Sequence, residues 1–276
     1  MNNEQPETLR IGSEATEVEI DPGRGGRIVQ ITFRGVRLLI GEDSVRALGD
    51  PIRWGCYPMA PWAGRIREGR FEFGGLVHQL PVGDDGHAIH GVGYTSAWSI
   101  DDHTATMLEL SLELPTDDTW RFGGHVHQRI SVDGDGDGDG DGDGDKIVLE
   151  LTVTAADQPF PAAIGWHPWF RKPDRLEFDP VAMYRRVDGI AIDERIEVQP
   201  GPWDDCFINA EPIIAVIDGV RVRLTSDCTE WVVYDTPEHA TCIEPQSGPP
   251  DAFNIRPEVL APGQMLSRSF RIGLTR

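Results

Sequence analysis

The fold of this chain is indicated most directly by IIAVIDGVRVRL, residues 213–224. Two runs rich in isoleucine, valine and leucine, residues 213–217 and 220–224, flank Asp218 and Gly219. An Asp-Gly pair between two such runs is a preferred two-residue connection of antiparallel strands, because both of its residues tolerate a positive φ. The stretch therefore predicts a β-hairpin, and it is the strongest hairpin signal in the chain.

Similar strand signals recur on both sides of this hairpin. A second hairpin is predicted around Gly74 and Gly75. No long window sustains a helical period, and no change of composition divides the chain. We therefore expect an all-β fold, a sandwich or a barrel, in a single domain over residues 1–276. The other predicted strands cover residues 17–20, 27–33, 70–73, 76–80, 107–114, 126–132, 147–154, 231–234 and 267–274.

The composition excludes several classes of function. Hydrophobic residues make up 39% of the 276 residues and charged residues 26%, which is typical of a soluble globular protein. Apolar runs are too short to span a membrane, and the N-terminus lacks the features of a signal peptide, so we expect a cytoplasmic location. The net charge of −21 argues against nucleic acids and membranes as partners. Four cysteines without a CxxC pair predict free, buried thiols.

An uninterrupted alternation of Asp and Gly occupies residues 133–145. Strand-like segments on both sides indicate that it forms the tip of an extended hairpin. Glycine offers no packing and the carboxylates repel one another, so we expect this tip to be disordered. Weak Ca²⁺ binding is an alternative, but no apolar residue recurs in the tract to build a repeat core, and a solvated loop is the preferred interpretation.

Three segments place isolated polar residues among aromatic residues and prolines. They are YPMAPWAGRIREG (57–69) with AIHGVG (88–93), IGWHPWF (164–170) and IEPQSGPPDAFN (243–254). Aromatic rings can stack on the C–H faces of a pyranose while polar groups bind its hydroxyls, so the pattern suits a sugar. Trp166 is the aromatic residue that we expect to contact it. The other candidates are Trp54, Tyr57, Trp62 and Trp169, and any of the five could instead belong to the core.

Each polar candidate also has a purely structural interpretation. His90, which precedes Gly91, could be a turn histidine. His167 could be a buried histidine whose hydrogen bonds are satisfied by the protein. Glu244 follows an apolar run, where a carboxylate needs a partner, and Arg65 could be that partner. Spacing alone leaves these alternatives open.

Taken together, the segments resemble the aldose 1-epimerase (galactose mutarotase) family. The motifs keep the family's order from about residue 20 to residue 272. Two departures bear on which sugar fits: Gly64 replaces the family's Asn, and Val92 replaces its second Gly. The matching motifs are GRIREGRF (64–71), HGVGY (90–94) followed by Trp98, GWHPWF (165–170), DDCF (204–207), EPQ (244–246), PDAFN (250–254) and LAPG (260–263).

The resemblance implies a large antiparallel β-sandwich, the galactose mutarotase-like supersandwich. It also implies exchange of sugar anomers by acid–base chemistry, with no cofactor and no metal. Glu244 would be the base that takes the proton of the C1 hydroxyl, and His167 the acid that protonates the ring oxygen. His90 and Arg65 would hold the ring oxygen and nearby hydroxyls. Asp204, which we prefer to its neighbour Asp205, would orient another hydroxyl.

The expected protonation states follow from ordinary pKa values. A glutamate ionises readily near neutral pH, whereas a histidine with a pKa of about 6.5 is mostly uncharged there. A carboxylate beside His167 would raise the pKa of its imidazole and keep it protonated. We therefore expect a bell-shaped dependence of rate on pH, with the alkaline limb set by His167.

Three other interpretations stay open. A hexose-phosphate mutarotase of the same superfamily would bind the phosphate through arginines near the motifs. A non-catalytic carbohydrate-binding protein would keep the aromatic residues without using the acid–base pair. A metal-binding protein could use His125 and His127, or His87 and His90, although exposed strand histidines are the preferred interpretation. The expected partner is a small-molecule sugar, and the chain would be a monomer or a homodimer. The arginines near the motifs that could bind the phosphate of a hexose phosphate are Arg53, Arg67, Arg70 and Arg171.

Overall fold

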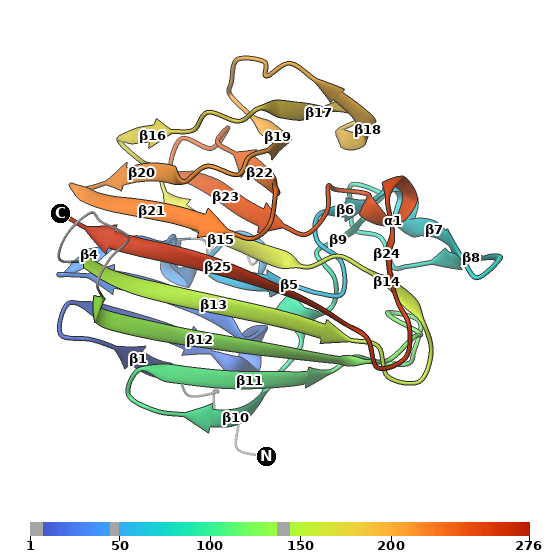
Figure 1. Ribbon diagram of the computed structural model, residues 1–276, viewed down its shortest axis with the longest axis horizontal. Coiled ribbons are helices and arrows are strands. Elements are labelled where there is room, and N and C mark those ends of the chain that lie inside the picture. Colours follow the sequence, from blue (N-terminus) through green and yellow to red (C-terminus); the bar gives the residue numbers. More distant parts are fainter. Residues whose placement is uncertain (1–7, 45–49, 137–143) are drawn as a thin grey trace.

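Two large antiparallel sheets face each other in the computed structural model (Figure 1). The structure describes residues 8–44, 50–136 and 144–276. Within these residues the larger sheet has 11 strands, the smaller has 8, and three strand pairs lie outside both. The large antiparallel β-sandwich expected from the sequence is thereby confirmed.

The larger sheet carries the segments with candidate site residues. Its order is β1-β2-β3-β5-β15-β23-β22-β19-β17-β18, with β4 paired to β3. The three strands β5, β15 and β23 are central in this order. The bounds are β1 (Leu9–Gly12), β2 (Thr16–Asp21), β3 (Arg27–Phe33), β4 (Val36–Arg37), β5 (Cys56–Met59), β15 (Gly165–Arg171), β17 (Ala182–Val187), β18 (Ile190–Ile196), β19 (Asp204–Ile208), β22 (Glu230–Tyr234) and β23 (Ala240–Gln246).

The smaller sheet has the order β10-β11-β12-β13-β25-β21-β20-β16. Its strands are β10 (Ser99–His103), β11 (Met107–Glu113), β12 (His125–Gly136), β13 (Gly144–Thr154), β16 (Arg175–Glu177), β20 (Ile213–Ile217), β21 (Val220–Ser226) and β25 (Met265–Thr275). The separate pairs are β6 (Arg65–Ile66) with β9 (Ala88–Ile89), β7 (Arg70–Phe73) with β8 (Leu76–Gln79), and β14 (Phe160–Ala162) with β24 (Glu258–Leu260). Helical segments are short: α1 (Ala252–Ile255), η1 (Pro22–Arg24), η2 (Glu42–Ser44), η3 (Arg67–Gly69) and η4 (Gly93–Thr95).

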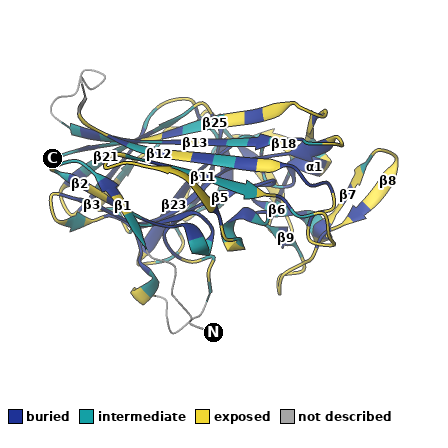
Figure 2. Ribbon diagram, turned by 90° about the horizontal axis from the view of Figure 1, so that it is seen from below, coloured by how far each residue is buried: buried dark blue, intermediate teal, exposed yellow. Residues whose placement is uncertain are grey.

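The core lies between the two sheets and is built by alternation along the strands (Figure 2). In β13 every second residue from Ile147 to Val153 is fully buried, while the residues between them are partly or fully exposed. Trp166 and Trp231 of the larger sheet belong to the same buried cluster. Each large apolar side chain buried in this way contributes about 1.5–3 kcal/mol, so the alternation accounts for the stacking of the sheets.

The hairpin at residues 213–224 forms as predicted. Strands β20 and β21 pair with Ile217 opposite Val220. Asp218 and Gly219 between them have φ of 48° and 77°, the positive values that a tight two-residue hairpin turn requires. The hairpin of β7 and β8 around Gly74 and Gly75 is likewise confirmed.

The strand signals missed the centre of the larger sheet. Strands β5 and β23 are buried along their whole length, and β15 is buried except at its last residue, so these strands show no alternation. Each also contains a proline, Pro58, Pro168 or Pro245, a residue that normally argues against a central strand. Their assignment depends on the neighbouring strands that cover them, which a local pattern does not contain.

The Asp/Gly tract is partly ordered. Strands β12 and β13 extend into it from both sides, and their ladder runs as far as Gly136 opposite Gly144. The expectation that all of residues 133–145 are disordered is therefore corrected at the two ends, where the growing ladder satisfies the backbone groups. Residues 137–143 lie outside the described residues, and for them disorder stays a prediction.

Two further expectations concern the cysteines and membrane-spanning segments. All four cysteines are free and buried, as the sequence predicted. Across residues 8–44, 50–136 and 144–276, no helix has the length and apolar character needed to cross a bilayer.

Candidate active site

Neighbouring central strands bring the candidate acid–base residues together on one face of the larger sheet. The register of β15 with β23 pairs Trp169 with Cys242, and continuing it by two residues places His167 opposite Glu244. On its other side, β15 places His167 opposite Tyr57 of β5. Directly opposed residues of antiparallel strands point to the same face, so Tyr57, His167 and Glu244 form one row.

His167 and Glu244 are in direct contact. The Nε2 atom of His167 lies 3.3 Å from Oε1 of Glu244. Only 6% of His167 and 3% of Glu244 is exposed to solvent. The other carboxylate oxygen, Oε2, accepts a hydrogen bond of 3.1 Å from Nε2 of Gln246. The carboxyl group is thus held between two side chains of known orientation.

A cavity of about 210 Å³ opens beside this pair. Pockets for drug-sized ligands are typically about 300–1,000 Å³, so this volume suits a smaller molecule. The structure places five of the predicted site residues on its lining: Arg65, His90, His167, Asp204 and Glu244. Trp169, Tyr234, Arg186 and Asp205 complete the part of the lining that could bind a polar ring.

Trp166 does not line this cavity. Its side chain is fully buried, and its ring lies 5.9 Å from that of Phe270 in the core. Successive residues of a strand point to opposite faces, so the strand that directs His167 to the cavity directs Trp166 to the core. The prediction that Trp166 contacts the sugar is therefore wrong. Trp169 takes the cavity position, two residues beyond His167, and its ring stacks on His167 at 5.6 Å between centroids.

His90 reaches the cavity from a tight turn after β9. Its φ is 58°, and that of Gly91 is 73°. A Cβ atom at Gly91 would lie 2.1 Å from the carbonyl oxygen of Ala60, so only glycine fits there. The ring of His90 stands edge-on to His167, with 4.8 Å between centroids. Its Nδ1 is buried and has no hydrogen-bond partner within the described chain.

Arg65 and Asp204 reach the cavity with ion-pair partners of their own. Nε of Arg65 lies 2.8 Å from Oδ2 of Asp85, so in the described residues its partner is Asp85 and not Glu244. Nη1 of Arg186 lies 3.1 Å from Oδ2 of Asp204, and its Nε lies 3.6 Å from Oδ1 of Asp205. Asp204 and Asp205 therefore share one arginine, and both line the cavity.

Burial shifts the pKa values of His167 and Glu244 so that each side chain favours its uncharged form. Loss of solvation lowers the pKa of His167 to about 3, and the charge of Arg65 adds to the decrease. Burial, followed by the charge of Asp204, raises the pKa of Glu244 well above its ordinary value. The expectation that a neighbouring carboxylate raises the pKa of His167 is wrong, because desolvation dominates the pKa and the charges of Arg65 and Arg27 act in the same direction. Both shifts favour a free site in which the proton of the pair resides on Glu244.

The histidine beside this pair is also uncharged. Burial lowers the pKa of His90 well below its ordinary value, and the neighbouring His167 and Arg65 act in the same direction. A neutral imidazole has one donor and one acceptor nitrogen, so His90 can bind a hydroxyl or a ring oxygen without adding a charge.

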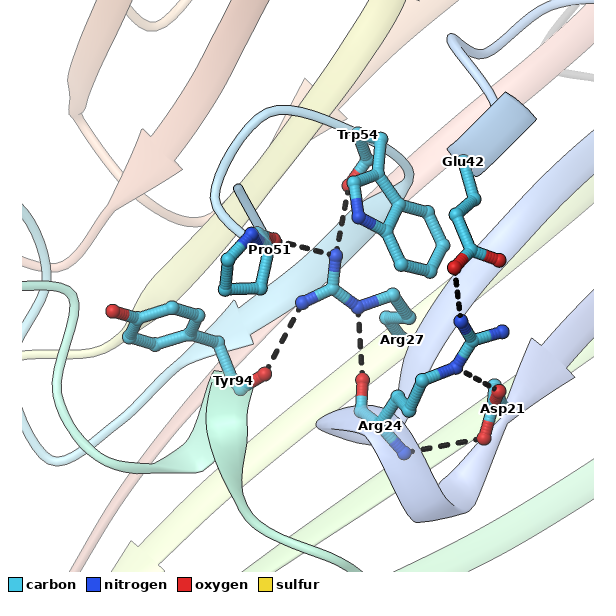
Figure 3. A network of polar contacts seen from close by, with 7 residues as sticks. All are labelled: Asp21, Arg24, Arg27, Glu42, Pro51, Trp54 and Tyr94. Atoms are coloured by element: carbon cyan, nitrogen blue, oxygen red, sulfur yellow. Dashed lines mark hydrogen bonds and ion pairs between the residues drawn. The ribbon is translucent and has the colours of Figure 1, made fainter. Parts of the chain in front are cut away.

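A buried arginine, Arg27, binds the loop that contributes Ile52 and Arg53 to the cavity lining. Figure 3 shows its hydrogen bonds to the surrounding backbone. Arg27 is 1% exposed, and its guanidinium lies 4.1 Å from the ring centroid of Trp54 and 5.1 Å from that of Tyr57. The Tyr57 ring in turn stacks on His167 at 4.9 Å between centroids. Sequence reasoning did not identify Arg27; its position at the start of an apolar strand was the one available signal. The guanidinium donates hydrogen bonds of 2.7–3.2 Å to the backbone carbonyls of Arg24, Pro51, Trp54 and Tyr94.

Of the histidines considered as metal ligands, His125 and His127 are engaged elsewhere. On the smaller sheet, Nδ1 of the exposed His125 lies 2.7 Å from Glu113, and Nε2 of the half-buried His127 lies 3.8 Å from Glu109. Within the residues that the structure describes, one set of three ligand-type side chains has its donor atoms within 4.8 Å of one another: His167, Cys242 and Glu244.

Comparison with known proteins identifies relatives of this chain. The family model described as Aldose 1-epimerase matches residues 7–273. Two proteins of Escherichia coli K12, the uncharacterized proteins YphB and YihR, are each 30% identical to it, over 117 and 93 residues. These matches cover 42% and 33% of this chain, and only 36% and 29% of the length of the two relatives.

Solved structures share the fold over nearly the full length. A candidate aldose 1-epimerase of Escherichia coli K12 superimposes with a TM-score of 0.82 at 19% identity, covering 98% of this chain and 99% of the other. The galactose 1-epimerase of Lactobacillus acidophilus NCFM gives a TM-score of 0.81 at 15% identity, covering 100% and 97%. The aldose epimerase homologue of C. elegans gives 0.77 at 16% identity, covering 98% and 99%. At these identities the similarity shows a common fold.

Proposed function

The chain belongs to the aldose 1-epimerase family, and we propose that it interconverts the α and β anomers of a free aldohexose. The observation that carries this proposal is the 3.3 Å approach of His167 Nε2 to Glu244 Oε1 on the lining of a small cavity. Two titratable groups in contact can take one proton from a bound sugar and supply another, which is what opening and closing the ring requires.

In the proposed reaction the two groups have opposite roles. Glu244, as carboxylate, takes the proton of the C1 hydroxyl, and His167, as imidazolium, gives a proton to the ring oxygen O5. The bond between C1 and O5 breaks as the C1 carbonyl forms. Rotation about the C1–C2 bond presents the other face of the aldehyde, and the reverse transfers close the ring. Protons and bonds balance without a cofactor.

The protonation of the free site adds one step. Burial favours the proton on Glu244, whereas ring opening needs it on His167. Transfer across the 3.3 Å between Oε1 and Nε2 produces the required form without exchange with solvent. The hydroxyls of a bound sugar can bind the carboxylate as it forms, which lowers the free energy of this charged form.

The other lining residues would hold the ring. His90, whose imidazole belongs to the lining, could bind a ring oxygen or a hydroxyl. The guanidinium of Arg65 and the carboxylate of Asp204 can bind further hydroxyls while keeping their ion-pair partners. Trp169 and Tyr234, whose rings lie 6.0 Å apart between centroids, provide aromatic surface suited to the C–H face of a pyranose.

The charges around the cavity favour an uncharged sugar over a hexose phosphate. The three arginines on its lining each form an ion pair with an aspartate: Arg53 with Asp50 at 2.8 Å, Arg65 with Asp85 at 2.8 Å, and Arg186 with Asp204 at 3.1 Å. A phosphate would have to displace a carboxylate from one of them, in a protein of net charge −21. A purely sugar-binding role has less support. Burying a titratable pair costs free energy, and binding alone would make no use of the pair's acid–base chemistry. A cytoplasmic location and a monomeric or homodimeric state stay predictions.

Polarimetry with a panel of freshly dissolved sugars tests the proposal. We expect the protein to accelerate the approach of α-glucose and α-galactose to anomeric equilibrium, and glucose 6-phosphate to be a poorer substrate. Acceleration of glucose 6-phosphate alone would favour the hexose-phosphate alternative. Binding of free sugars without any acceleration would favour the non-catalytic one.

A further inference from the structure

We propose that the acid–base pair and Cys242 together form a binding site for one soft divalent cation, Zn²⁺ or Cd²⁺, and that the bound cation blocks the sugar reaction. The binding itself is independent of the proposed function. The inhibition rests on that function, since it requires His167 and Glu244 to transfer protons.

The three donor atoms are already close to the geometry of a zinc site. His167, Cys242 and Glu244 each offer one atom, and all three lie within 4.8 Å of one another. With zinc–ligand bonds of about 2.0–2.3 Å in a tetrahedron, neighbouring donor atoms lie roughly 3.3–3.8 Å apart. The 3.3 Å between His167 Nε2 and Glu244 Oε1 already equals one edge of such a tetrahedron. The thiol lies no more than 4.8 Å from either of the other donor atoms, so it has to move by about 1 Å at most.

The strands hold the donors in this arrangement. Cys242 precedes Glu244 by two residues on β23 and pairs with Trp169 of β15, so its side chain points to the same face as His167 and Glu244. All three residues lie on central strands of the larger sheet, where the backbone cannot relax easily. The hydrogen bond from Gln246 to Oε2 of Glu244 orients the carboxylate, as a second layer of contacts does around metal ligands.

The donor set selects the kind of cation. A thiolate, an imidazole and a carboxylate are typical zinc ligands, and thiolate favours zinc and cadmium over magnesium and calcium. Three protein ligands leave a fourth position for water or a sugar oxygen. Cys242 is itself fully buried, so the cation would enter from the cavity past His167 and Glu244. Its binding releases the thiol proton and the proton of the pair to solvent.

Cadmium absorbance measures the site directly. Titrating the wild-type protein with Cd²⁺ should produce the ultraviolet thiolate-to-cadmium charge-transfer band with one equivalent bound. Cys242→Ser should lose the band and bind Cd²⁺ about 100-fold more weakly, and Cys242→Ala should behave alike if the serine variant folds poorly. Cys228→Ser, which removes another buried thiol, is the matched control and should keep the band. A wild-type protein without the band, or equal loss in Cys228→Ser, would overturn the proposal.

Polarimetry in the presence of Zn²⁺ measures the consequence. Zn²⁺ should slow anomer exchange in proportion to occupancy, a chelator should restore the rate, and Cys242→Ser should need about 100-fold more Zn²⁺ for the same inhibition. The two proposals fail separately. A cadmium band in a protein that does not accelerate anomer exchange supports the cation site and rejects the proposed function, whereas exchange without a band rejects only the cation site.

Discussion

His167 and Glu244 oppose each other on adjacent strands, and Nε2 of the histidine lies 3.3 Å from Oε1 of the glutamate. Burial lowers the pKa of the imidazole to about 3 and raises that of the carboxyl group. At pH values between the pKa of His167 and the raised pKa of Glu244, the pair holds one proton, and the two groups share it. This shared proton is the basis of the first three predictions.

Glu244→Gln should reduce the rate of anomer exchange at least about 100-fold, the contribution typical of a positioned base. The amide preserves the size of the side chain but cannot take the proton of the C1 hydroxyl. Polarimetry with α-galactose measures the rate. Glu113→Gln, at an exposed glutamate of the smaller sheet, should leave it unchanged. A near-wild-type rate for Glu244→Gln would reject Glu244 as the base.

His167→Asn should invert the response to alkaline pH as well as slow the reaction. The wild-type protein loses its shared proton as pH rises through the raised pKa of Glu244, so its rate should fall. Without His167, only ionised Glu244 can act as base, so the residual rate should rise over the same range. Polarimetry as a function of pH compares the two profiles. Parallel pH profiles for the wild type and the variant would show that His167 and Glu244 do not share a proton.

Glu244→Gln should also stabilise the fold, and increasingly so as pH rises. The pKa of Glu244 is higher in the folded than in the unfolded chain, so between the two values only the folded state holds the proton. The free energy of unfolding of the wild type therefore decreases with rising pH in this window, by up to about 1.4 kcal/mol per pH unit. Denaturant unfolding at several pH values should show a difference that grows with pH. A difference in free energy of unfolding that does not change with pH would contradict a buried, protonated Glu244.

Trp169 and Trp166 should respond differently to replacement by phenylalanine. Trp169→Phe removes aromatic surface from the cavity and should raise KM for the sugar several-fold. Trp166→Phe leaves a void in the core and should lower the free energy of unfolding by about 1–3 kcal/mol, with KM unchanged. Steady-state polarimetry and denaturant unfolding of both variants separate the two roles. A raised KM for Trp166→Phe would restore its predicted contact with the sugar.

Arg27→Lys should destabilise the protein despite keeping the charge. The guanidinium bridges four backbone carbonyls, and an ammonium group with three donors in a different geometry cannot reach them all. Buried acceptors left without a donor should lower the free energy of unfolding by about 2 kcal/mol or more. Arg34→Lys, at an exposed arginine on a turn, is the control. Equal stability of the two variants would show that the loop at Pro51–Trp54 does not depend on Arg27.

Much of the fold followed from local patterns. The Asp218-Gly219 turn and the alternation in residues 147–153 were sufficient to predict a hairpin and a half-buried strand, and both are present. The family motifs also located five residues that line the cavity, among them His167 and Glu244. These features could be predicted because turn geometry and alternation depend on neighbours in the chain.

The tertiary structure alone decided how the side chains are arranged at the centre of the larger sheet. It showed that β15 directs His167 and Trp169 to the cavity and Trp166 to the core, and that Arg27 binds a loop that lines the cavity. It also reversed the expected pKa shift of His167. The physical reason is common to these findings. A strand buried on both faces has no alternating pattern, and the loss of solvation that sets a pKa depends on atoms brought close by folding from distant parts of the chain.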